Sequence, residues 1–486
     1  MGKGGKGKRG KGEKGERGKG EKGKGEKGKR GKGEIGESFR FPLFLFALPT
    51  LFSSVSPSMS PFPLSPLSLK PPCPCYPEKS SPPSTRADST MTEQPTRICI
   101  LGGGFGGLYT ALRLSQLPWE GTQKPEIVLV DKSDRFLFIP LLYELLTGEL
   151  QSWEIAPPFA EVLNNTGVRF CQGTVAGIDV EQQRVQLQEG VEIPYDRLIL
   201  TLGGESPLDK VPGAASYAFP FRTLADAYRL EERLRVLEQS DKDKIRIAIV
   251  GGGYCGVELA CKLADRLGER GRFRIIEQAN QILRNSPEYN RENATKTLEA
   301  KGVWLDLETS VESIGADSIS LMYKGTVDTI PVDIVLWTVG MQGSPVVRNL
   351  PLKQNQRGQL VTTPTLQAID REEIFVLGDL AECRDNEGQI VPPSAQAAFQ
   401  QSDYAAWNVW ASVTKRPMLP FRYQNLGEML TLGTDSATYT GMGLKLDGQV
   451  AYLMRRLAYL YRMPGLEHQL KVGVSWISNP ILDAIK

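Results

Sequence analysis

A strand–glycine–helix pattern that occurs twice constrains this chain more than any other feature. In its first copy, residues 97–131, an apolar strand is followed by Gly102, Gly104 and Gly107, spaced as G-x-G-x-x-G, and then by a helix. The first glycine permits a tight turn, the second lets a pyrophosphate approach the backbone, and the third lets the helix pack closely on the strand. Asp131 ends the next strand, 24 residues after Gly107. A carboxylate there can accept a hydrogen bond from a ribose hydroxyl.

The second copy has Gly251, Gly253 and Gly256, with Glu277 following 21 residues after the last glycine. Two fingerprints with distal acids arise by chance far more rarely than one. They predict an α/β fold with two Rossmann-like dinucleotide-binding domains, which most economically hold a flavin and a nicotinamide. Glu277 would bond a ribose 2′-hydroxyl and repel a 2′-phosphate, which favours NADH, whereas the nearby Arg284 leaves NADPH open.

A later strand predicts how the two domains are connected. It ends at Gly378 and Asp379, where an aspartate can bond a ribityl hydroxyl or cap the following turn. We therefore expect the FAD-binding domain in two parts, residues 96–220 and 344–420, with the NAD(P)H-binding domain, residues 221–343, inserted between them.

The first 38 residues differ strongly in composition from the rest. They hold 14 Lys/Arg and 6 Glu among many glycines, whose mixed spacings exclude a collagen repeat. With almost no apolar side chain, this tract is predicted to be disordered, and binding of the basic tail to RNA or membrane is an alternative. The other 448 residues carry 44 basic and 50 acidic side chains, so bulk charge does not predict nucleic-acid binding.

Residues 39–95 form a Ser/Pro-rich leader. Its apolar run FPLFLFALPTLF has only 12 residues and contains prolines, so it is too short to span a bilayer. A Ser-rich, acid-poor stretch is typical of an organelle transit peptide. We expect a plastid or mitochondrial address, with a structural linker as the alternative. Met59 and Met91 are alternative starts.

Cysteine and histidine usage limits the chemistry. None of the seven cysteines forms a C-x-x-C motif, and His468 is the only histidine. We therefore expect no metal site, no histidine-based triad and no disulfide scaffold.

Seven motifs resemble those of the type II NAD(P)H:quinone oxidoreductases, members of the two-dinucleotide flavoprotein reductases. They are LGGGFGGLYTA, FLFIPLLYELLTGEL, YDRLILTLGG, IVGGGYCGVELA, VDIVLWTVG, VLGDLAEC and PPSAQAAFQQSDYAAWN. The resemblance runs from about residue 97 to residue 486 and is greatest to the C-type branch of plastids and cyanobacteria. That branch is linked with plastoquinone and with a demethylated phylloquinone precursor.

The resemblance implies a role for each matched position. The first three fingerprint glycines and Asp131 would bind the adenosine diphosphate part of FAD, and Gly378 and Asp379 its ribityl chain. The second set and Glu277 would hold NADH or NADPH.

Further residues would serve the quinone. Glu258 would lie near flavin and quinone and deliver protons. Gln396, with Gln400 and Gln401, would form the quinone motif, and Gln396 would also contact the cofactor. Lys445 is a candidate for the lysine that the family places near the quinone.

The implied reaction is hydride transfer from NAD(P)H to bound FAD and transfer of two electrons to a membrane quinone, without proton pumping. One alternative is a sulfide:quinone oxidoreductase, in which Cys171 and Cys383 would have to meet. Another is a non-catalytic NADH-sensing flavoprotein. A homodimer is one oligomeric state that the sequence leaves open.

The C-terminal part, residues 421–486, is expected to anchor the protein to a membrane. Within it, a helical stripe comprises Val450, Leu453, Met454, Leu457, Leu460 and Tyr461. Arg455, Arg456 and Arg462 lie off this stripe, and Tyr452 and Tyr459 suit the headgroup level. The pattern predicts an interfacial helix that lies in a bilayer surface. The resemblance implies that this is a chloroplast membrane, thylakoid or plastoglobule, with a mitochondrial membrane as the alternative. The alternative is a helix whose apolar stripe docks on the protein core.

Overall fold

The computed structural model of the chain describes residue 2, residues 95–119 and residues 124–485. Nearly all of the predicted disordered tract, residues 1–38, and of the leader, residues 39–95, therefore lies outside the described residues. The described body belongs to one compact unit, residues 71–486.

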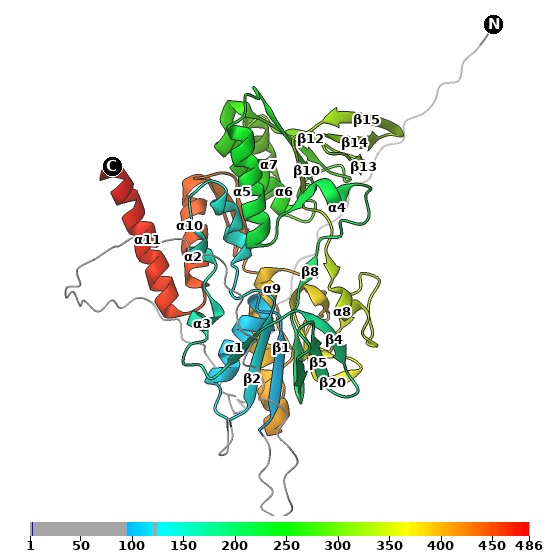
Figure 1. Cartoon of the computed structure of the whole chain (residues 1–486), viewed down its shortest axis with the longest axis vertical. Coiled ribbons are helices and arrows are strands. Elements are labelled where there is room, and N and C mark those ends of the chain that lie inside the picture. Colours follow the sequence, from blue (N-terminus) through cyan, green and yellow to red (C-terminus); the bar gives the residue numbers. More distant parts are fainter. Residues whose placement is uncertain (1, 3–94, 120–123, 486) are drawn as a thin grey trace, which may run out of the picture. The chain divides into compact units, whose positions relative to one another are not determined.

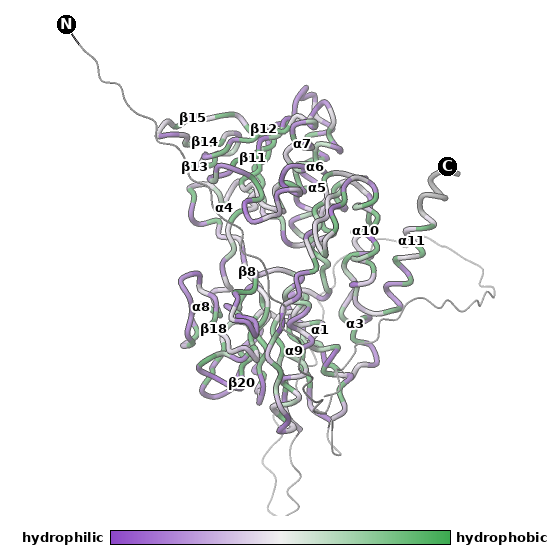
Figure 2. Tube along the Cα trace, turned by 180° about the vertical axis from the view of Figure 1, so that it is seen from behind, coloured by the Kyte–Doolittle hydropathy of each residue, from purple (hydrophilic) through white to green (hydrophobic). Residues whose placement is uncertain are grey.

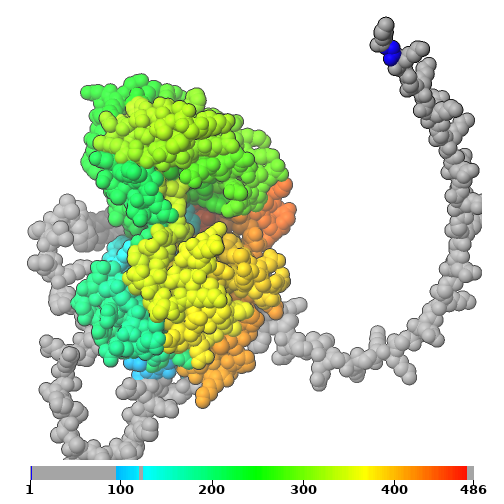
Figure 3. All heavy atoms as spheres, turned by 90° about the vertical axis from the view of Figure 1, so that its right-hand side faces the viewer, coloured from blue at the N-terminus to red at the C-terminus, as the bar shows by residue number. Residues whose placement is uncertain are grey.

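The first sheet is built around β1 (Arg97–Leu101), whose last four residues are buried as expected for a strand covered on both faces. Its strand order is β19 (Gln367–Ala368), β20 (Arg371–Val376), β7 (Arg197–Leu200), β1, β2 (Glu126–Asp131) and β3 (Arg169–Gln172). Neighbours pair in parallel except for β19 and β20. β20 thus joins the sheet that β1 begins, although the second glycine unit separates them in the chain (Figure 1). Figure 3 shows the late segments in yellow and orange lying against the early blue-green ones.

The second sheet repeats this arrangement. Its order is β12 (Trp304–Asp306), β11 (Gly271–Ile276), β10 (Ile245–Val250), β16 (Ile334–Trp337) and β9 (Ala218–Pro220), all parallel. β9 lies just before residue 221, the expected start of the NAD(P)H-binding domain, yet its backbone pairs with β16. The strand had no recognisable sequence pattern because it is only three residues long.

Helices follow the glycine turns as the sequence predicts. They are α1 (Phe105–Gln116) after β1 and α6 (Tyr254–Leu267) after β10. α5 (Leu224–Glu238) begins at Thr223, whose side chain accepts a hydrogen bond from the Asp226 N–H and so caps the helix. α7 (Glu288–Ala300) contacts α6, and α9 (Ala395–Thr414) packs along α1.

Short elements connect these layers. The helical ones are η1 (Ile139–Leu145), α2 (Ser152–Ile155), α3 (Phe159–Val162), α4 (Ala214–Tyr217), η2 (Gly268–Arg270), α8 (Pro345–Arg348) and η3 (Gly378–Leu380). The strands are β4 (Val175–Asp179), β5 (Arg184–Leu187), β6 (Glu192–Pro194), β8 (Gly204–Glu205), β13 (Thr309–Ile314), β14 (Ser318–Tyr323), β15 (Thr326–Pro331), β17 (Gln342–Gly343), β18 (Leu360–Val361) and β21 (Ala381–Glu382).

The C-terminal part forms an antiparallel sheet followed by two helices. The sheet consists of β22 (Glu428–Thr431), β23 (Ala437–Gly441) and β24 (Leu444–Asp447). The helices are α10 (Gly448–Tyr461) and α11 (Leu466–Ile485), and the second had not been predicted. Among the residues described, no helix is both long enough and apolar enough to cross a membrane.

Candidate functional site

The first glycine turn is crowded on one side and open on the other. Gly102 has a φ of +98°, and a Cβ there would lie 2.4 Å from the carbonyl oxygen of Thr201. A Cβ on Gly107 would lie 1.8 Å from the carbonyl oxygen of Gly102. A Cβ on Gly104 would meet nothing within 4 Å. The open side at the N-terminus of α1 therefore has room for a phosphate close to the backbone.

The second glycine turn has the same geometry. Gly251 has a φ of +113°, and a Cβ on Gly256 would lie 1.9 Å from the carbonyl oxygen of Gly251. A Cβ on Gly253 would again meet nothing within 4 Å. Both turns thus have the geometry that a dinucleotide pyrophosphate requires.

A threonine clamps each turn from the neighbouring strand, a feature that the sequence prediction missed. The Thr201 hydroxyl lies 2.8 Å from the carbonyl oxygen of Leu101 and 2.7 Å from that of Gly102. The Thr338 hydroxyl lies 2.8 Å from the carbonyl oxygen of Val250 and 3.3 Å from that of Gly251. The repeated strand–Thr–x–Gly sequence, LTLGG and WTVG, could have revealed the pair.

The two predicted ribose acids bond to their own glycine turns. Asp131 accepts a hydrogen bond of 2.6 Å from the Gly103 N–H, and Glu277 accepts one of 2.8 Å from the Gly252 N–H. In each case the other carboxylate oxygen accepts a backbone N–H two residues further along the chain. Burial raises the pKa of Asp131, and the N–H groups oppose this effect. Both acids therefore fix the end of the second strand against the turn.

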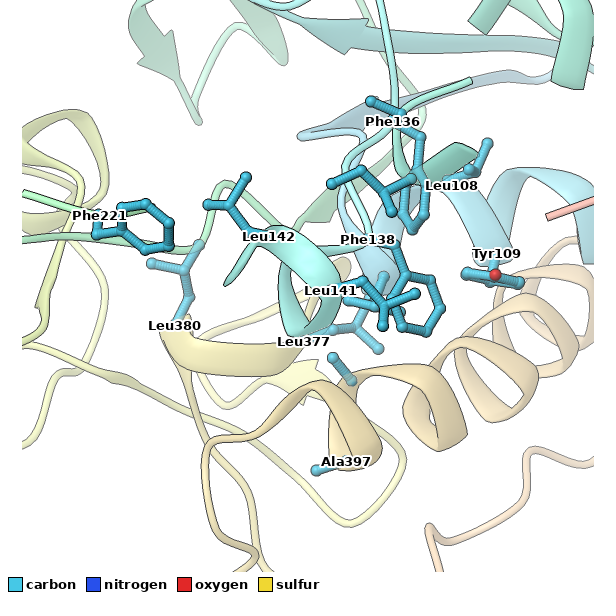
Figure 4. Close-up of a cluster of buried hydrophobic side chains, with 14 of the residues drawn as sticks. Leu108, Tyr109, Phe136, Phe138, Leu141, Leu142, Phe221, Leu377, Leu380 and Ala397 are labelled. Atoms are coloured by element: carbon cyan, nitrogen blue, oxygen red, sulfur yellow. The ribbon is translucent and has the colours of Figure 1, made fainter. Parts of the chain in front are cut away.

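An aromatic segment leads from the first sheet toward η1 (Figure 4). The Phe136 and Phe138 rings contact the Phe105 ring edge-on, with centroids 5.4 and 5.1 Å apart. Further along, the Tyr143 ring stacks on Phe221 at 5.5 Å. Apolar packing thus fixes the position of η1.

Asp379 lies in η3, at the end of β20. Its carboxylate is 3.7 Å from the guanidinium of Arg222, which precedes α5. Burial raises the pKa of Asp379, and Arg222 opposes the rise. The neighbouring Gly378 N–H donates to the side chain of Gln401 at 2.8 Å, which ties η3 to α9.

The three predicted catalytic residues all contact one C-terminal segment, residues 423–431. Gln400 exchanges two hydrogen bonds with the backbone of Gln424, at 2.9 and 3.0 Å. Gln396 accepts hydrogen bonds from the Tyr423 hydroxyl at 3.1 Å and from the Leu426 N–H at 3.0 Å. At the end of the segment, the Thr431 N–H donates to Glu258 at 3.0 Å.

These contacts bring Glu258 and the glutamine motif to one segment, but they also give each side chain a structural partner. The side-chain NH2 of Gln396 donates to the carbonyl oxygen of Gly427 at 3.1 Å. Both glutamines therefore hold residues 423–427 against the start of α9, and their role toward a quinone stays a prediction.

Glu258 is the fifth residue of α6 and is buried. Burial raises its pKa to about 7, while Arg455 and the Thr431 N–H oppose the rise. A carboxyl group with this pKa exchanges a proton near neutral pH, as a general acid requires.

Glu258 belongs to a group of charges that we name the buried ion cluster. It comprises the buried Glu144, Glu258, Lys262 and Arg455 and the partly buried Glu149. Arg455 lies 2.5 Å from Glu144 and 3.9 Å from Glu258. Lys262 forms an ion pair with Glu149 and lies 3.9 Å from Glu144. Sequence analysis identified Glu258 alone as a site residue, because Glu144, Glu149 and Arg455 come from segments distant from α6, and the partner of Lys262, Glu149, is one of them.

Arg455 is placed differently from what an interfacial helix would require. The sequence analysis put it off the apolar stripe together with Arg456 and Arg462, yet its side chain is fully buried and also donates to the carbonyl oxygen of Pro140 at 2.6 Å. Part of the apolar stripe faces outward, with Leu453 and Leu457 59% and 56% exposed, whereas Met454 and Leu460 pack against the core. The ion pair of Arg455 with Glu144 of η1 and the packing of Ala451 against Ala437 and Tyr439 of β23 dock α10 on the body.

Two tyrosines of α10 are also placed differently from the prediction. Tyr452 donates to Glu149 at 2.5 Å, and the Tyr459 ring lies 5.3 Å from that of Phe138, so both face the body. Lys445, the candidate family lysine, lies in β24 over the ring of Tyr289 at 5.6 Å. Arg455, rather than Lys445, is the cation that lies 3.9 Å from Glu258.

The described cysteines are Cys99, Cys171, Cys255, Cys261 and Cys383, and all five are free thiols. Cys171 and Cys383, which a sulfide:quinone mechanism would have to bring together, form no disulfide. Within the described ranges, no group of three or more potential metal-ligating side chains is present.

Comparisons with known proteins agree with this geometry. The family model described as pyridine nucleotide-disulphide oxidoreductase matches residues 96–402. Demethylphylloquinone reductase NdbB of Synechocystis sp. is 58% identical over 400 residues, which span 82% of this chain and 99% of that protein. The chloroplastic/mitochondrial alternative NAD(P)H-ubiquinone oxidoreductase C1 of Arabidopsis thaliana is 45% identical, over 80% of this chain and 82% of its own.

Among solved structures, NDH2 from Plasmodium falciparum in complex with NADH superposes with a TM-score of 0.70 at 16% identity, covering 80% of this chain and 98% of that one. At that identity the likeness shows the shared fold. The chain therefore belongs to the pyridine nucleotide-disulphide oxidoreductase family and, within it, to the type II NAD(P)H:quinone oxidoreductases, which bind FAD and oxidise NAD(P)H.

Proposed function

We propose that this protein passes reducing equivalents from NAD(P)H through bound FAD to a membrane quinone of the plastoquinone or demethylphylloquinone class, without pumping protons. The proposal rests on the presence in one chain of two glycine turns that are open to a phosphate and of a buried carboxyl group, Glu258, whose pKa is raised to about 7. The names of the cyanobacterial and plant relatives support the quinone class.

The chain's own groups bind and orient the two nucleotides. The N–H groups at the start of α1 would hold the FAD pyrophosphate, and Asp379 at the end of β20 would contact the ribityl chain. The equivalent turn before α6 would hold NAD(P)H, with Glu277 at the ribose. When bound, FAD supplies the two-electron chemistry, and the protein supplies position and exclusion of water.

Quinone reduction consumes two protons, and Glu258 is placed to supply one of them. Its carboxyl group is shielded from solvent and bonded to β22, the strand that follows the segment fixed by Gln396 and Gln400. The two glutamines would contact the quinone ring at that segment, and Gln396 would also lie beside the cofactor.

We place the enzyme at a chloroplast membrane, thylakoid or plastoglobule, to which it binds peripherally. α10 and α11 expose a row of large apolar side chains: Val450, Leu453, Leu457, Tyr461, Leu466, Leu470, Val474 and Ile477. Figure 2 shows apolar (green) stretches along both helices. Between the helices runs a groove of about 1150 Å³ that Glu149 also lines. An apolar face of this size suits the headgroup–acyl boundary, where lipid-soluble quinone enters.

Anaerobic spectroscopy tests the function. Purified protein should be yellow, release FAD on denaturation, lose its flavin absorbance with NADH or NADPH, and regain it when a plastoquinone or demethylphylloquinone analogue is added. A colourless protein that cannot be reconstituted with FAD would refute the proposal. Reduction by sulfide but not by NAD(P)H would favour a sulfide:quinone oxidoreductase, and reduction without reoxidation by quinone would favour a nucleotide sensor.

A further inference from the structure

Lys262 is a buried cation to which the reaction proposed above assigns no role. It follows Glu258 by four residues on α6, so both side chains lie on the same face of the helix. Its side chain is fully buried. The ammonium group pairs with Glu149, whose other oxygen accepts a hydrogen bond of 2.5 Å from the Tyr452 hydroxyl.

The charges of the buried ion cluster do not balance when every member is ionised. Two cations, Lys262 and Arg455, face three carboxylates. Glu149 and Glu144 each have a cation in direct contact, whereas Glu258 lies 3.9 Å from Arg455, which is already bonded to Glu144. Because an unpaired buried charge is expensive, Glu258 is the member that retains a proton.

We propose that Glu149 and Lys262 are positioning residues that set the protonation of Glu258: Glu149 neutralises Lys262, so that Glu258, one turn away, keeps its proton until quinone requires it. This inference rests on the proposed function, in which Glu258 is the proton donor. The inference adds that the protonation of Glu258 depends on a residue at the groove between α10 and α11. Glu149 lines that groove, and its side chain is 13% exposed.

Other titratable groups around Glu258 are neutral near pH 7 and do not alter the charge balance. They are Tyr143, Tyr254, Cys255, Cys261 and Tyr459. Burial raises the pKa of every one, to about 12 for each of the two thiols. The half-buried Arg456 donates to the Tyr452 hydroxyl at 3.0 Å and stacks over Trp476.

The test is a cycle of two substitutions in the FAD-loaded enzyme. Glu149→Gln keeps the size of the side chain and the hydrogen bond from Tyr452 but frees the charge of Lys262. Lys262→Met keeps a side chain of similar length and removes a cation. The titration midpoint of the Glu258 carboxyl is measured by infrared difference spectroscopy, with Glu258→Gln identifying its band.

Glu149→Gln should lower this midpoint by about one pH unit, and Lys262→Met should raise it by a similar amount. The double variant should return close to the wild type, because it removes one charge of each sign. The basic limb of quinone reduction by pre-reduced enzyme should move with the midpoint. Flavin reduction by NADH should not change its pH profile.

Glu232→Gln is the matched control, since it breaks an exposed pair with Arg235 on α5 and should move neither reading. A midpoint unchanged in Glu149→Gln, or equal shifts in the same direction in both single variants, would overturn the inference. Failure of the proposed function is separable. If Glu258→Gln leaves quinone reduction unaltered, Glu258 is not the proton donor, yet the infrared midpoints still report whether Glu149 and Lys262 control its protonation.

Discussion

Lys262 lies one helical turn beyond Glu258 on α6, yet its buried ammonium group pairs with Glu149, which follows η1. Together with the pairing of Arg455 and Glu144, this contact joins three segments of the chain: the η1 region, α6 and α10. Glu258, the proposed proton donor, therefore lies close to α10 through Arg455, and α10 also carries part of the exposed apolar row.

The raised pKa of Glu258 predicts a pH dependence. A carboxyl group with a pKa of about 7 is protonated below pH 7 and loses its proton as the pH rises through that value. Quinone reduction by pre-reduced enzyme should therefore fall above about pH 7. Glu258→Gln should slow this half-reaction about 100-fold and abolish the pH dependence. Stopped-flow measurements should show flavin reduction by NADH much less affected. Equal slowing of both half-reactions would instead indicate a structural role.

Substitution of Thr201 or Thr338, each of which bonds one glycine turn, should affect the binding of one nucleotide and not the other. Thr201→Val removes the hydroxyl that bonds the first glycine turn and should weaken FAD retention about tenfold, with the KM for NADH little changed in enzyme saturated with FAD. Thr338→Val should raise the KM for NADH by a similar factor and leave FAD bound. FAD release by dialysis and steady-state kinetics measure the two effects. Loss of FAD from both variants would mean that the clamps stabilise the fold in general.

Arg455 should contribute much more to stability than an exposed arginine does. Arg455→Met leaves Glu144, only 1% exposed, without its closest cation and should cost about 3–5 kcal/mol in unfolding free energy. Arg184→Met, which breaks an exposed pair with Glu192, should cost less than about 1 kcal/mol. Urea denaturation of the two variants measures the difference, and similar costs would contradict a buried role for Arg455.

The same pair predicts how stability changes with pH. Burial alone would raise the pKa of Glu144, but Arg455 and Lys262 hold it below its usual value of 4.5. The stabilisation is therefore present above pH 4.5 and is lost as the pH falls below it. This acid sensitivity should be weaker in Arg455→Met than in the wild type.

The exposed row on α10 and α11 predicts membrane binding that can be removed without unfolding the protein. Cutting the chain after Gly448 would also remove Arg455, so substitution is the cleaner test. Leu453→Ser with Leu457→Ser should reduce binding to galactolipid vesicles at least tenfold and impair reduction of long-tailed quinones. Activity with a water-soluble acceptor should survive. Trp304→Ser on β12, 66% exposed in the wild type, is the control. Unchanged vesicle binding would assign the row to a protein contact.

Glu277 predicts the choice of nicotinamide. Glu277→Gln removes the charge that would repel a 2′-phosphate and should raise the ratio of NADPH to NADH activity severalfold. The carboxylate also accepts the Gly252 N–H, which the amide oxygen of glutamine can still do. Steady-state kinetics with both nucleotides measure the ratio, and an unchanged ratio would place Glu277 away from the ribose.

The two nucleotide units could be predicted because their determinants are local in sequence. A positive φ requires glycine at positions 102 and 251, and the carbonyl oxygens of these two residues, in the same turns, leave no room for a Cβ at positions 107 and 256. The acid that follows the next strand bonds back to the same turn, so its spacing also follows from one strand–helix–strand unit. Composition and spacing carried this information without knowledge of the tertiary structure.

The surroundings of Glu258 could not be predicted from the sequence, because they are formed by tertiary contacts. Glu144, Glu149, Lys262 and Arg455 meet only when η1, α6 and α10 pack together, and no spacing in the chain records that contact. Periodicity gave the apolar stripe of α10 correctly but not the face that docks. The buried ion pair of Arg455 with Glu144 and the hydrogen bond from Tyr452 to Glu149 hold the opposite face against the body and leave Leu453 and Leu457 exposed. A helical pattern specifies which residues share a face, whereas the partners available in the folded chain decide which face is buried.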